Sequence, residues 1–259
     1  MALIEVRQEG SVGTIVLNNG GRRNALSHDL VASLIEALQG FRDSEVRVVI
    51  LRAQPGVKVW SAGHDVDELP ESRRDPLGWD DPLRNLVRTL EMHPAPVIAM
   101  IEGTVWGGGV ETILACDIVI ATPESTFAVT PARLGVPYNL SGLMTFMSAG
   151  SLRIIKELAF TAAPISAERA ERVGMINHVV PGDQLEAFTL RMATTIAGNA
   201  PLSISVMKEQ FRVLAGAKPL SPRGFEKVQG LRRVVYDSHD YEEGIRAFKE
   251  KRKPTYLGR

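Results

Sequence analysis

Two glycine-containing turns have the residue types and spacing that best fit catalysis. Residues 97–101 form an uninterrupted apolar run, which predicts a buried strand, and three glycines follow at residues 107–109. The apolar spacing of residues 110–116 predicts that these glycines open a helix. A second such turn, at residues 62–64, follows the strand predicted at residues 46–51. Because the first N–H groups of a helix have no partner inside it, each turn can present donors to an anion.

The two turns make a joint prediction if their strands are neighbours in a sheet. Their free N–H groups would then converge and form an oxyanion hole, which contributes about 3–4 kcal/mol of transition-state stabilisation for each donor. A run of glycines also suits a tight turn with close helix packing, and the glycines alone leave this interpretation open. The dinucleotide pattern G-x-G-x-x-G is not met and no Walker lysine follows, so nucleotide binding is not predicted.

The elements around these turns predict an α/β fold. Strand and helix patterns alternate up to about residue 140, which implies βα units with largely parallel strand pairing. From about Ser141 the pattern is mainly helical. It includes a final helix at residues 240–251, for which Asp240 is the expected N-cap and Glu243 completes a capping box.

Composition narrows the classes of partner. The chain has 259 residues, enough for one large core. It carries 30 Lys and Arg against 30 Asp and Glu, so no overall charge attracts nucleic acid or an anionic membrane. No apolar run is long enough to span a bilayer. The single cysteine, Cys116, excludes an internal disulfide and favours a reducing, cytoplasmic location. The expected partner is therefore a small molecule, with no nucleic acid and no membrane.

Four motifs carry a resemblance to a known family. Residues 61–66, 103–111, 116–121 and 134–137 read SAGHDV, GTVWGGGVE, CDIVIA and LGVP, and they resemble the crotonase (enoyl-CoA hydratase/isomerase) superfamily. Within it the chain is similar to the branch that decarboxylates methylmalonyl-CoA. That closer similarity rests on His64, Trp106, Thr130-Pro131, Val136-Pro137-Tyr138-Asn139-Leu140 and Tyr236-Asp237-Ser238.

The resemblance implies a crotonase-like spiral of βα units at residues 1–195 and a helical trimerisation region at residues 196–259. It implies an acyl-CoA substrate and a homotrimer or a dimer of trimers. By motif, the N–H groups of His64 and Gly108 would hold the thioester oxygen. The family's substrate contacts fall on Asn24, Ala25, Leu26, Ala62, Gly63, His64, Asp65, Val66, Gly108, Thr130 and Lys251, of which Lys251 would contact a phosphate of coenzyme A.

The residues also bear on which reaction of the family is expected. Hydratases of this family activate water with two glutamates, and the resemblance places them at Glu111 and at residue 131. Residue 131 is proline, which cannot transfer a proton. Glu111 either supports the glycine turn electrostatically from the first turn of its helix or acts as an acid if burial raises its pKa. The missing glutamate is the strongest argument from the sequence against hydration.

Decarboxylation makes different demands on the site. The departing carboxylate leaves its electron pair to the thioester, so an oxyanion hole supplies the main acceleration. Thr130 and Tyr138 are neutral hydroxyl donors that can orient the carboxylate without stabilising it as strongly as a cation would. Tyr138 or a water can return the proton to the enolate. This chemistry predicts no metal, flavin, nicotinamide or biotin, and coenzyme A enters only as part of the substrate.

Three functions therefore remain. The first is decarboxylation of methylmalonyl-CoA or malonyl-CoA to propionyl-CoA or acetyl-CoA, with His64, Gly108, Thr130, Tyr138 and Glu111 as catalytic candidates. The second is an enoyl-CoA hydratase or isomerase that uses Glu111 alone. The third is a noncatalytic acyl-CoA-binding protein. Asp65, Asp67 and Glu68 superficially suggest a metal site, but their position predicts a helix cap.

Overall fold

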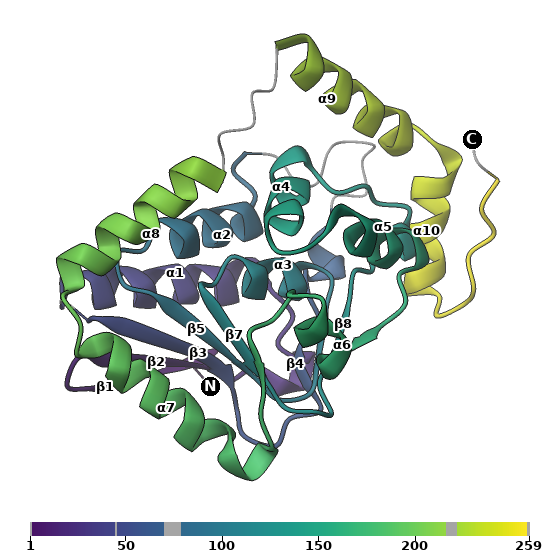
Figure 1. Ribbon diagram of the computed structural model, residues 1–259. Coiled ribbons are helices and arrows are strands. Elements are labelled where there is room, and N and C mark those ends of the chain that lie inside the picture. The colour runs from purple at the N-terminus through teal and green to yellow at the C-terminus, as the bar shows by residue number, and fades with distance from the viewer. Residues whose placement is uncertain (1, 45, 70–78, 216–221, 258–259) are drawn as a thin grey trace.

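The computed structural model describes residues 2–44, 46–69, 79–215 and 222–257, and its strands form two sheets (Figure 1). The larger sheet has the order β1-β2-β3-β5-β7-β10, and the smaller one has the order β4-β6-β8-β9. The larger sheet contains β1 (Ile4–Glu9), β2 (Val12–Leu17), β3 (Val48–Ala53), β5 (Val97–Ile101), β7 (Ile118–Ala121) and β10 (His178–Val179). The smaller sheet contains β4 (Val59–Ser61), β6 (Thr104–Trp106), β8 (Thr126–Ala128) and β9 (Ile165–Ser166).

The strand pairing confirms the predicted parallel βα organisation. β1 and β2 form an antiparallel hairpin, and β2, β3, β5, β7 and β10 follow in parallel. In the smaller sheet β4, β6 and β8 are parallel, while β9 is antiparallel to β8. The short strands β9 and β10 lie in the part of the chain that the sequence predicts to be mainly helical, and β10 falls within residues 175–180, whose pattern predicts a short strand.

Helices cover both faces of the larger sheet. The α-helices are α1 (His28–Asp43), α2 (Pro82–Met92), α3 (Gly108–Leu114), α4 (Leu140–Ser148), α5 (Leu152–Thr161), α6 (Ala167–Arg172), α7 (Gly182–Ala197), α8 (Pro201–Ala215), α9 (Pro222–Tyr236) and α10 (His239–Lys249). Short 3-10 helices are η1 (Gly20–Arg22), η2 (Val66–Glu68) and η3 (Pro131–Leu134). Figure 1 shows α1 and α2 on one side of the strands and α7 on the other.

The alternation of side chains along β3 explains these two layers. Val49 and Leu51 join the core cluster that includes α1, α2 and α3. Val48 and Ile50 face the opposite side and pack in a second cluster with Leu185 and other residues of α7. Because successive side chains of a strand point to opposite faces, an uninterrupted apolar strand requires a helix layer on each side.

The order of the strands brings the two glycine turns together. β3, β5 and β7 of the larger sheet are each followed by one strand of the smaller sheet, namely β4, β6 and β8. β4 and β6 are parallel neighbours, with Val59 opposite Thr104 and Ser61 opposite Val105. The turn that follows β4 therefore lies beside the turn that follows β6. The condition for convergence of the two turns is met.

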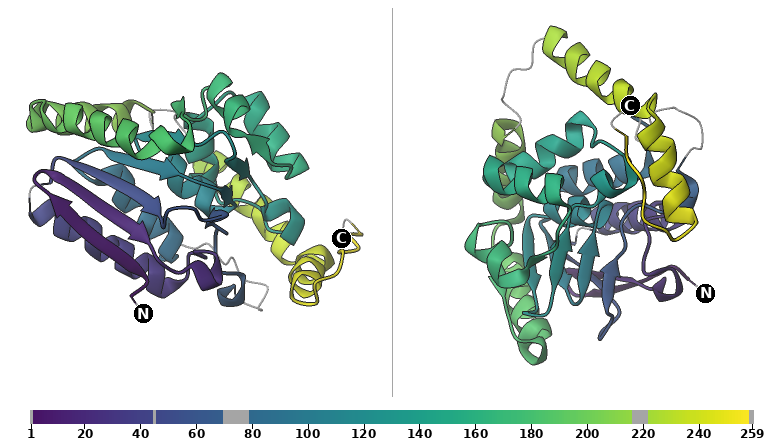
Figure 2. Two further views of the ribbon diagram at one scale, coloured as in Figure 1. Left: turned by 90° about the horizontal axis from the view of Figure 1, so that it is seen from below. Right: turned by 90° about the vertical axis from the view of Figure 1, so that its right-hand side faces the viewer.

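The C-terminal helices leave the core and then return to it. Figure 1 and the right-hand view of Figure 2 show α9 standing apart from the sheets, whereas α10 lies against the body of the molecule. α10 packs on η3 at two glycines, because a Cβ on Gly244 would lie 2.3 Å from the carbonyl oxygen of Leu134 and one on Gly135 would lie 2.6 Å from that of Asp240. This close approach places α10 over the region that follows β8.

Two details differ from the sequence predictions. Ser238, not Asp240, caps α10, and its side chain accepts a hydrogen bond from the N–H of Tyr241. Glu243 is buried and binds Arg246 and Arg252 instead of completing a capping box.

The predicted boundary at residue 195 falls inside α7, which runs to Ala197, and the division into two domains stays a prediction. Among the described residues no helix is long and apolar enough to cross a membrane.

Candidate active site

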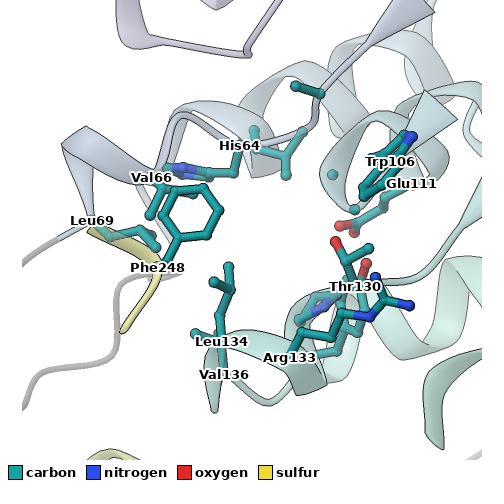
Figure 3. Close-up of a pocket in the computed structure, with 16 residues that line it drawn as sticks. His64, Val66, Leu69, Trp106, Glu111, Thr130, Arg133, Leu134, Val136 and Phe248 are labelled. Atoms are coloured by element: carbon teal, nitrogen blue, oxygen red, sulfur yellow. The ribbon is translucent and has the colours of Figure 1, made fainter. Parts of the chain in front are cut away.

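A cavity of about 330 Å³ lies where the two glycine turns meet η3, the segment that follows η3, and α10 (Figure 3). The predicted catalytic residues His64, Gly108, Glu111, Thr130 and Tyr138 all line it. Its remaining walls come from Ala62, Val66, Leu69, Leu83, Trp106, Gly107, Pro131, Arg133, Leu134, Val136 and Phe248. The sequence therefore predicted residues that the fold brings together from four separate stretches.

The backbone N–H groups of His64 and Gly108 lie close together at this cavity. A Cβ added to Gly108 would be 3.2 Å from the nitrogen of His64, and a Cβ added to Gly63 would be 2.9 Å from the nitrogen of Gly108. Gly63 also has a φ of +84°, and its added Cβ would lie 2.4 Å from the carbonyl oxygen of Trp106. A side chain at residue 63 would thus push the two turns apart.

Neither of these two N–H groups donates a hydrogen bond to a described residue. Gly107 acts as the N-cap of α3 and directs its own N–H to the carbonyl oxygen of Ala128 at 2.8 Å. The N–H of Gly108 is thereby left at the open start of the helix, where the helix dipole favours negative charge. Two adjacent unpartnered donors in a concave site have the geometry of an oxyanion hole.

Polar contacts behind the cavity hold the turn at residues 62–64 in place. Ser61 accepts a hydrogen bond through Oγ from the N–H of Gly63 at 3.1 Å and donates one to the carbonyl oxygen of Asn24 at 2.8 Å. The Asn24 amide donates to the carbonyl oxygen of Trp60 at 2.9 Å. Leu26 donates through its N–H to the carbonyl oxygen of Gly63 at 2.8 Å. The turn is therefore fixed from behind by buried hydrogen bonds.

The predicted substrate contacts divide into two groups. Ala62, His64, Val66, Gly108 and Thr130 line the cavity. Asn24, Ala25 and Leu26 are buried beside the turn, and neither they nor Gly63 and Asp65 line the cavity. Asp65 caps η2 by accepting from the N–H of Asp67, as predicted, and pairs with Arg22 at 2.8 Å. Lys251 follows α10 as an exposed residue, three positions after Phe248 of the cavity wall.

Both ring nitrogens of His64 lie within hydrogen-bond distance of neighbouring oxygen atoms. Nδ1 lies 3.0 Å from the carbonyl oxygen of Asp65, and Nε2 lies 3.3 Å from a carboxylate oxygen of Asp81. Burial opposes the charged ring, but the hydrogen bond and the negative charge of Asp81 outweigh it and raise the pKa of His64 above its ordinary value. Because both ring nitrogens interact with Asp65 and Asp81, His64 serves the cavity through its backbone.

Glu111 forms a buried ion pair with Arg84 of α2. The side chains are 1% and 4% exposed, so the pair is almost completely removed from water. Burial lowers the pKa of Arg84, yet its guanidinium neutralises the carboxylate at the cavity wall. Gly142 of α4 makes room for the pair, because a Cβ there would lie 2.9 Å from Oε1 of Glu111. This pairing favours the supporting role of Glu111 over the role of an acid.

A second part of the cavity wall carries two residues with hydroxyl groups, Thr130 and Tyr138. The Tyr138 hydroxyl is buried and has no hydrogen-bond partner among the described residues. Burial raises the pKa of Tyr138, so the phenol stays protonated and can donate. Its ring packs edge-on against Phe146, with centroids 4.9 Å apart. Oγ1 of Thr130 lies 3.0 Å from where a Cβ of Gly107 would be, so it sits directly beside the glycine turn.

Sequence reasoning missed four residues of this site: Asp81, Arg84, Arg133 and Phe248. Asp81-Pro82 carries a recognisable helix-start signal, since Asp81 caps α2 through the N–H of Arg84 and Pro82 occupies the first turn. The other three come to the site only through tertiary packing: Arg133 and Phe248 line the cavity, and Arg84 pairs with Glu111 of its wall. Among the described residues no group of His, Cys, Asp and Glu side chains is arranged to hold a metal ion.

Comparison with known proteins places this site in a family. Residues 7–259 match the family model described as enoyl-CoA hydratase/isomerase. The chain belongs to this family. It is 51% identical over 247 residues to the methylmalonyl-CoA decarboxylase of Escherichia coli (strain K12), a match that covers 95% of each chain. The predicted crotonase membership is thus confirmed.

Solved structures agree with the fold. The structure of a methylmalonyl-CoA decarboxylase in complex with 2-nitronate-propionyl-CoA has a TM-score of 0.98 and 49% sequence identity to this chain. The structure of the same kind of enzyme complexed with 2S-carboxypropyl CoA gives the same two values. Each match covers 100% of this chain and 99% of the other. The predicted crotonase-like α/β architecture is therefore confirmed, while the trimerisation role of the C-terminal helices stays a prediction.

Proposed function

We propose that this protein decarboxylates a malonyl-type CoA thioester, with methylmalonyl-CoA as substrate and propionyl-CoA and CO2 as products. The observation that carries the proposal is one cavity lined by His64, Gly108 and Tyr138, whose two backbone N–H groups and buried hydroxyl have no hydrogen-bond partner among the described residues. The presence of Pro131 in the wall, where hydration needs a second carboxylate, supports the same reaction. The 51% identity to the Escherichia coli enzyme points to the same substrate.

The reaction follows from where negative charge moves. The bond between the α-carbon and the carboxylate breaks, CO2 leaves, and the bonding electron pair passes into the thioester to give an enolate. The N–H groups of His64 and Gly108 donate to the enolate oxygen, where charge develops in the transition state. A proton from the Tyr138 hydroxyl or from a water then completes propionyl-CoA. A Tyr138 that has donated its proton regains it from solvent, so the cycle needs no bound cofactor.

The hydroxyl wall gives the carboxylate a place without holding it too tightly. Thr130 and Tyr138 can donate hydrogen bonds to it, and both are uncharged. A strong ion pair in the ground state would be lost as the carboxylate becomes neutral CO2, which raises the barrier. Glu111 does not repel the substrate strongly because Arg84 neutralises it. The interior of the cavity is therefore suited to a carboxylate that has to leave.

Parallel assays of two thioesters test this proposal. The purified protein is incubated with methylmalonyl-CoA, and CO2 and propionyl-CoA are quantified, while hydration of crotonyl-CoA is followed in a separate sample. We expect equal amounts of CO2 and propionyl-CoA, unchanged by a metal chelator, and no hydration. Hydration without release of CO2 would establish the hydratase alternative. Tight binding of both thioesters without turnover would establish an acyl-CoA-binding protein.

The same proposal includes assembly as a homotrimer or a dimer of trimers. Large apolar side chains are exposed along α8 and α9 in the single chain, namely Leu202, Val206, Met207, Phe211, Val213, Leu214, Leu231 and Val234. Uncovered apolar surface of this kind is typical of a subunit interface. Sedimentation equilibrium should give a mass of three or six chains, and a monomer would contradict this part of the proposal. A cytoplasmic location likewise stays a prediction.

A further inference from the structure

Arg133 is a charged residue of the cavity wall that the mechanism does not use. It lies at the end of η3, and its N–H donates to the carbonyl oxygen of Thr130 at 2.9 Å. Its own carbonyl oxygen accepts a hydrogen bond from the Tyr256 hydroxyl, which fixes the backbone at this point. The side chain is exposed, in contrast to the buried Arg84. Arg133 therefore belongs to the rim of the cavity.

The charges that line the cavity are otherwise balanced. Glu111 is paired with Arg84, and His64 is paired with Asp81. The guanidinium of Arg133 has no acidic partner and donates no hydrogen bond within the described ranges. Among the charged residues that line the cavity in the described part of the chain, Arg133 is therefore the one whose charge is not balanced by a partner.

The direction of the side chain indicates which part of a thioester it meets. In Figure 3 Arg133 extends from η3 along the wall that carries Thr130, towards the end of the cavity where Glu111 and Trp106 lie. Phe248, Val66 and Leu69 lie towards the other end. The α-carbon and its carboxylate have to lie near the hydroxyl wall of Thr130 and Tyr138 if the oxyanion hole is to act. Arg133 is thus at the acyl end of the cavity, away from Phe248, Val66 and Leu69.

We infer that Arg133 captures the acyl carboxylate of the substrate at the rim of the cavity, before it reaches the neutral wall where CO2 departs. This inference rests on the proposed function, because it names the anion that the same site accepts. The division of labour has a physical reason. A cation in the buried interior would stabilise the ground-state carboxylate and slow the reaction, whereas an exposed cation attracts the anion at long range and is weakened by solvent at contact.

A pair of CoA thioesters separates this role from general CoA binding. 2-Nitronate-propionyl-CoA carries an anionic acyl end, whereas propionyl-CoA has the same CoA portion and a neutral acyl end. We expect Arg133→Gln to weaken binding of the nitronate thioester about threefold to tenfold in calorimetry at low salt, and to leave propionyl-CoA binding unchanged. Arg133→Lys should keep most of the affinity. Arg153→Gln, which removes an exposed arginine outside the cavity, is the matched control.

Kinetics give an independent readout. With methylmalonyl-CoA, Arg133→Gln should lower kcat/KM by the same factor through KM, leave kcat unchanged and flatten the dependence of kcat/KM on ionic strength. Equal weakening of both thioesters would overturn the inference in favour of contact with a CoA phosphate. An unchanged nitronate affinity, a fall confined to kcat, or failure of Arg133→Lys to rescue binding would also overturn it. If the wild type binds the nitronate thioester selectively but releases no CO2, the proposed function fails while the role of Arg133 stands.

Discussion

Two walls of the cavity use different parts of the chain for recognition. The wall of the turns consists of backbone donors, the N–H groups of His64 and Gly108, which the parallel pairing of β4 and β6 brings together. The wall of η3 and the segment after it consists of side chains, chiefly Thr130, Pro131 and Tyr138. The first wall can stabilise any thioester oxyanion, whichever bond breaks. The second wall determines which bond that is.

The ion pair of Arg84 and Glu111 joins α2 to α3 behind the backbone donors, and breaking it should have the largest effect. Arg84→Met leaves a buried carboxylate without a partner, so we expect the free energy of unfolding to fall by about 3–5 kcal/mol in urea titrations. The double variant Arg84→Met, Glu111→Gln should recover most of this loss, because it removes the orphaned charge. If the double variant is as unstable as the single one, the contact between α2 and α3 depends on packing and not on the charge of the pair.

Filling the oxyanion hole with a side chain tests the function of the backbone N–H groups most directly. A Cβ at residue 108 would lie 2.7 Å from Cδ2 of Leu83 and 3.2 Å from the nitrogen of His64, where the thioester oxygen has to fit. We expect Gly108→Ala to lower kcat about 10²–10³-fold, the usual effect of losing one donor. In Gly150→Ala the added Cβ meets only Ile155, at 3.6 Å, so this control should keep full activity. Normal kcat in Gly108→Ala would show that the turns do not hold the oxyanion.

Adding a carboxylate at residue 131 tests whether the charge of the side-chain wall selects the reaction. In Pro131→Glu a new negative charge faces the departing carboxylate, and like charges at close range cost enough for a fall in kcat/KM of about tenfold or more. Pro131→Gln keeps the size of the new side chain without the charge and should be less impaired. Steady-state assays of both variants with methylmalonyl-CoA measure the difference. Equal activity of the two variants would mean that charge at residue 131 does not select the reaction.

The pair of His64 and Asp81 supports the backbone wall and should give the smallest effect. Because the pKa of His64 is raised in the folded protein, the pair contributes its full stability below the ordinary value of 6.5 and loses it as the pH rises through the folded-state pKa. Asp81→Asn removes the charge and retains a side chain that can cap α2. The gap in free energy of unfolding between wild type and Asp81→Asn should narrow as the pH increases above 6.5. A gap that is constant with pH would exclude a protonated His64.

The backbone wall was predictable from the sequence because its signals are local. A buried strand followed by glycine and an apolar-periodic segment predicts the turns at residues 62–64 and 107–109, and parallel pairing of neighbouring strands then makes them converge. Thr130 and Tyr138 were found only through the resemblance to a family. Their placement at the same cavity as the turns depends on how η3 and the segment after it pack.

The charged partners could not be predicted, since they are separated in the sequence. Arg84 and Glu111 are 27 positions apart, and their pairing depends on the contact of α2 with α3 and α4. The capping box expected at Asp240 shows a related failure. Ser238 caps α10 two residues earlier, and Glu243 is drawn instead to Arg246, Arg252 and the N–H of Thr255. Local patterns do not reveal which of several competing partners a charged side chain meets.

The most direct test of the account is a crystal structure of this protein with 2-nitronate-propionyl-CoA. The account predicts that the thioester oxygen accepts hydrogen bonds from the N–H groups of both His64 and Gly108, and that the nitronate oxygens face Thr130 and Tyr138. A thioester oxygen outside hydrogen-bond distance of these two N–H groups, or a nitronate directed at the pair of Arg84 and Glu111, would contradict it.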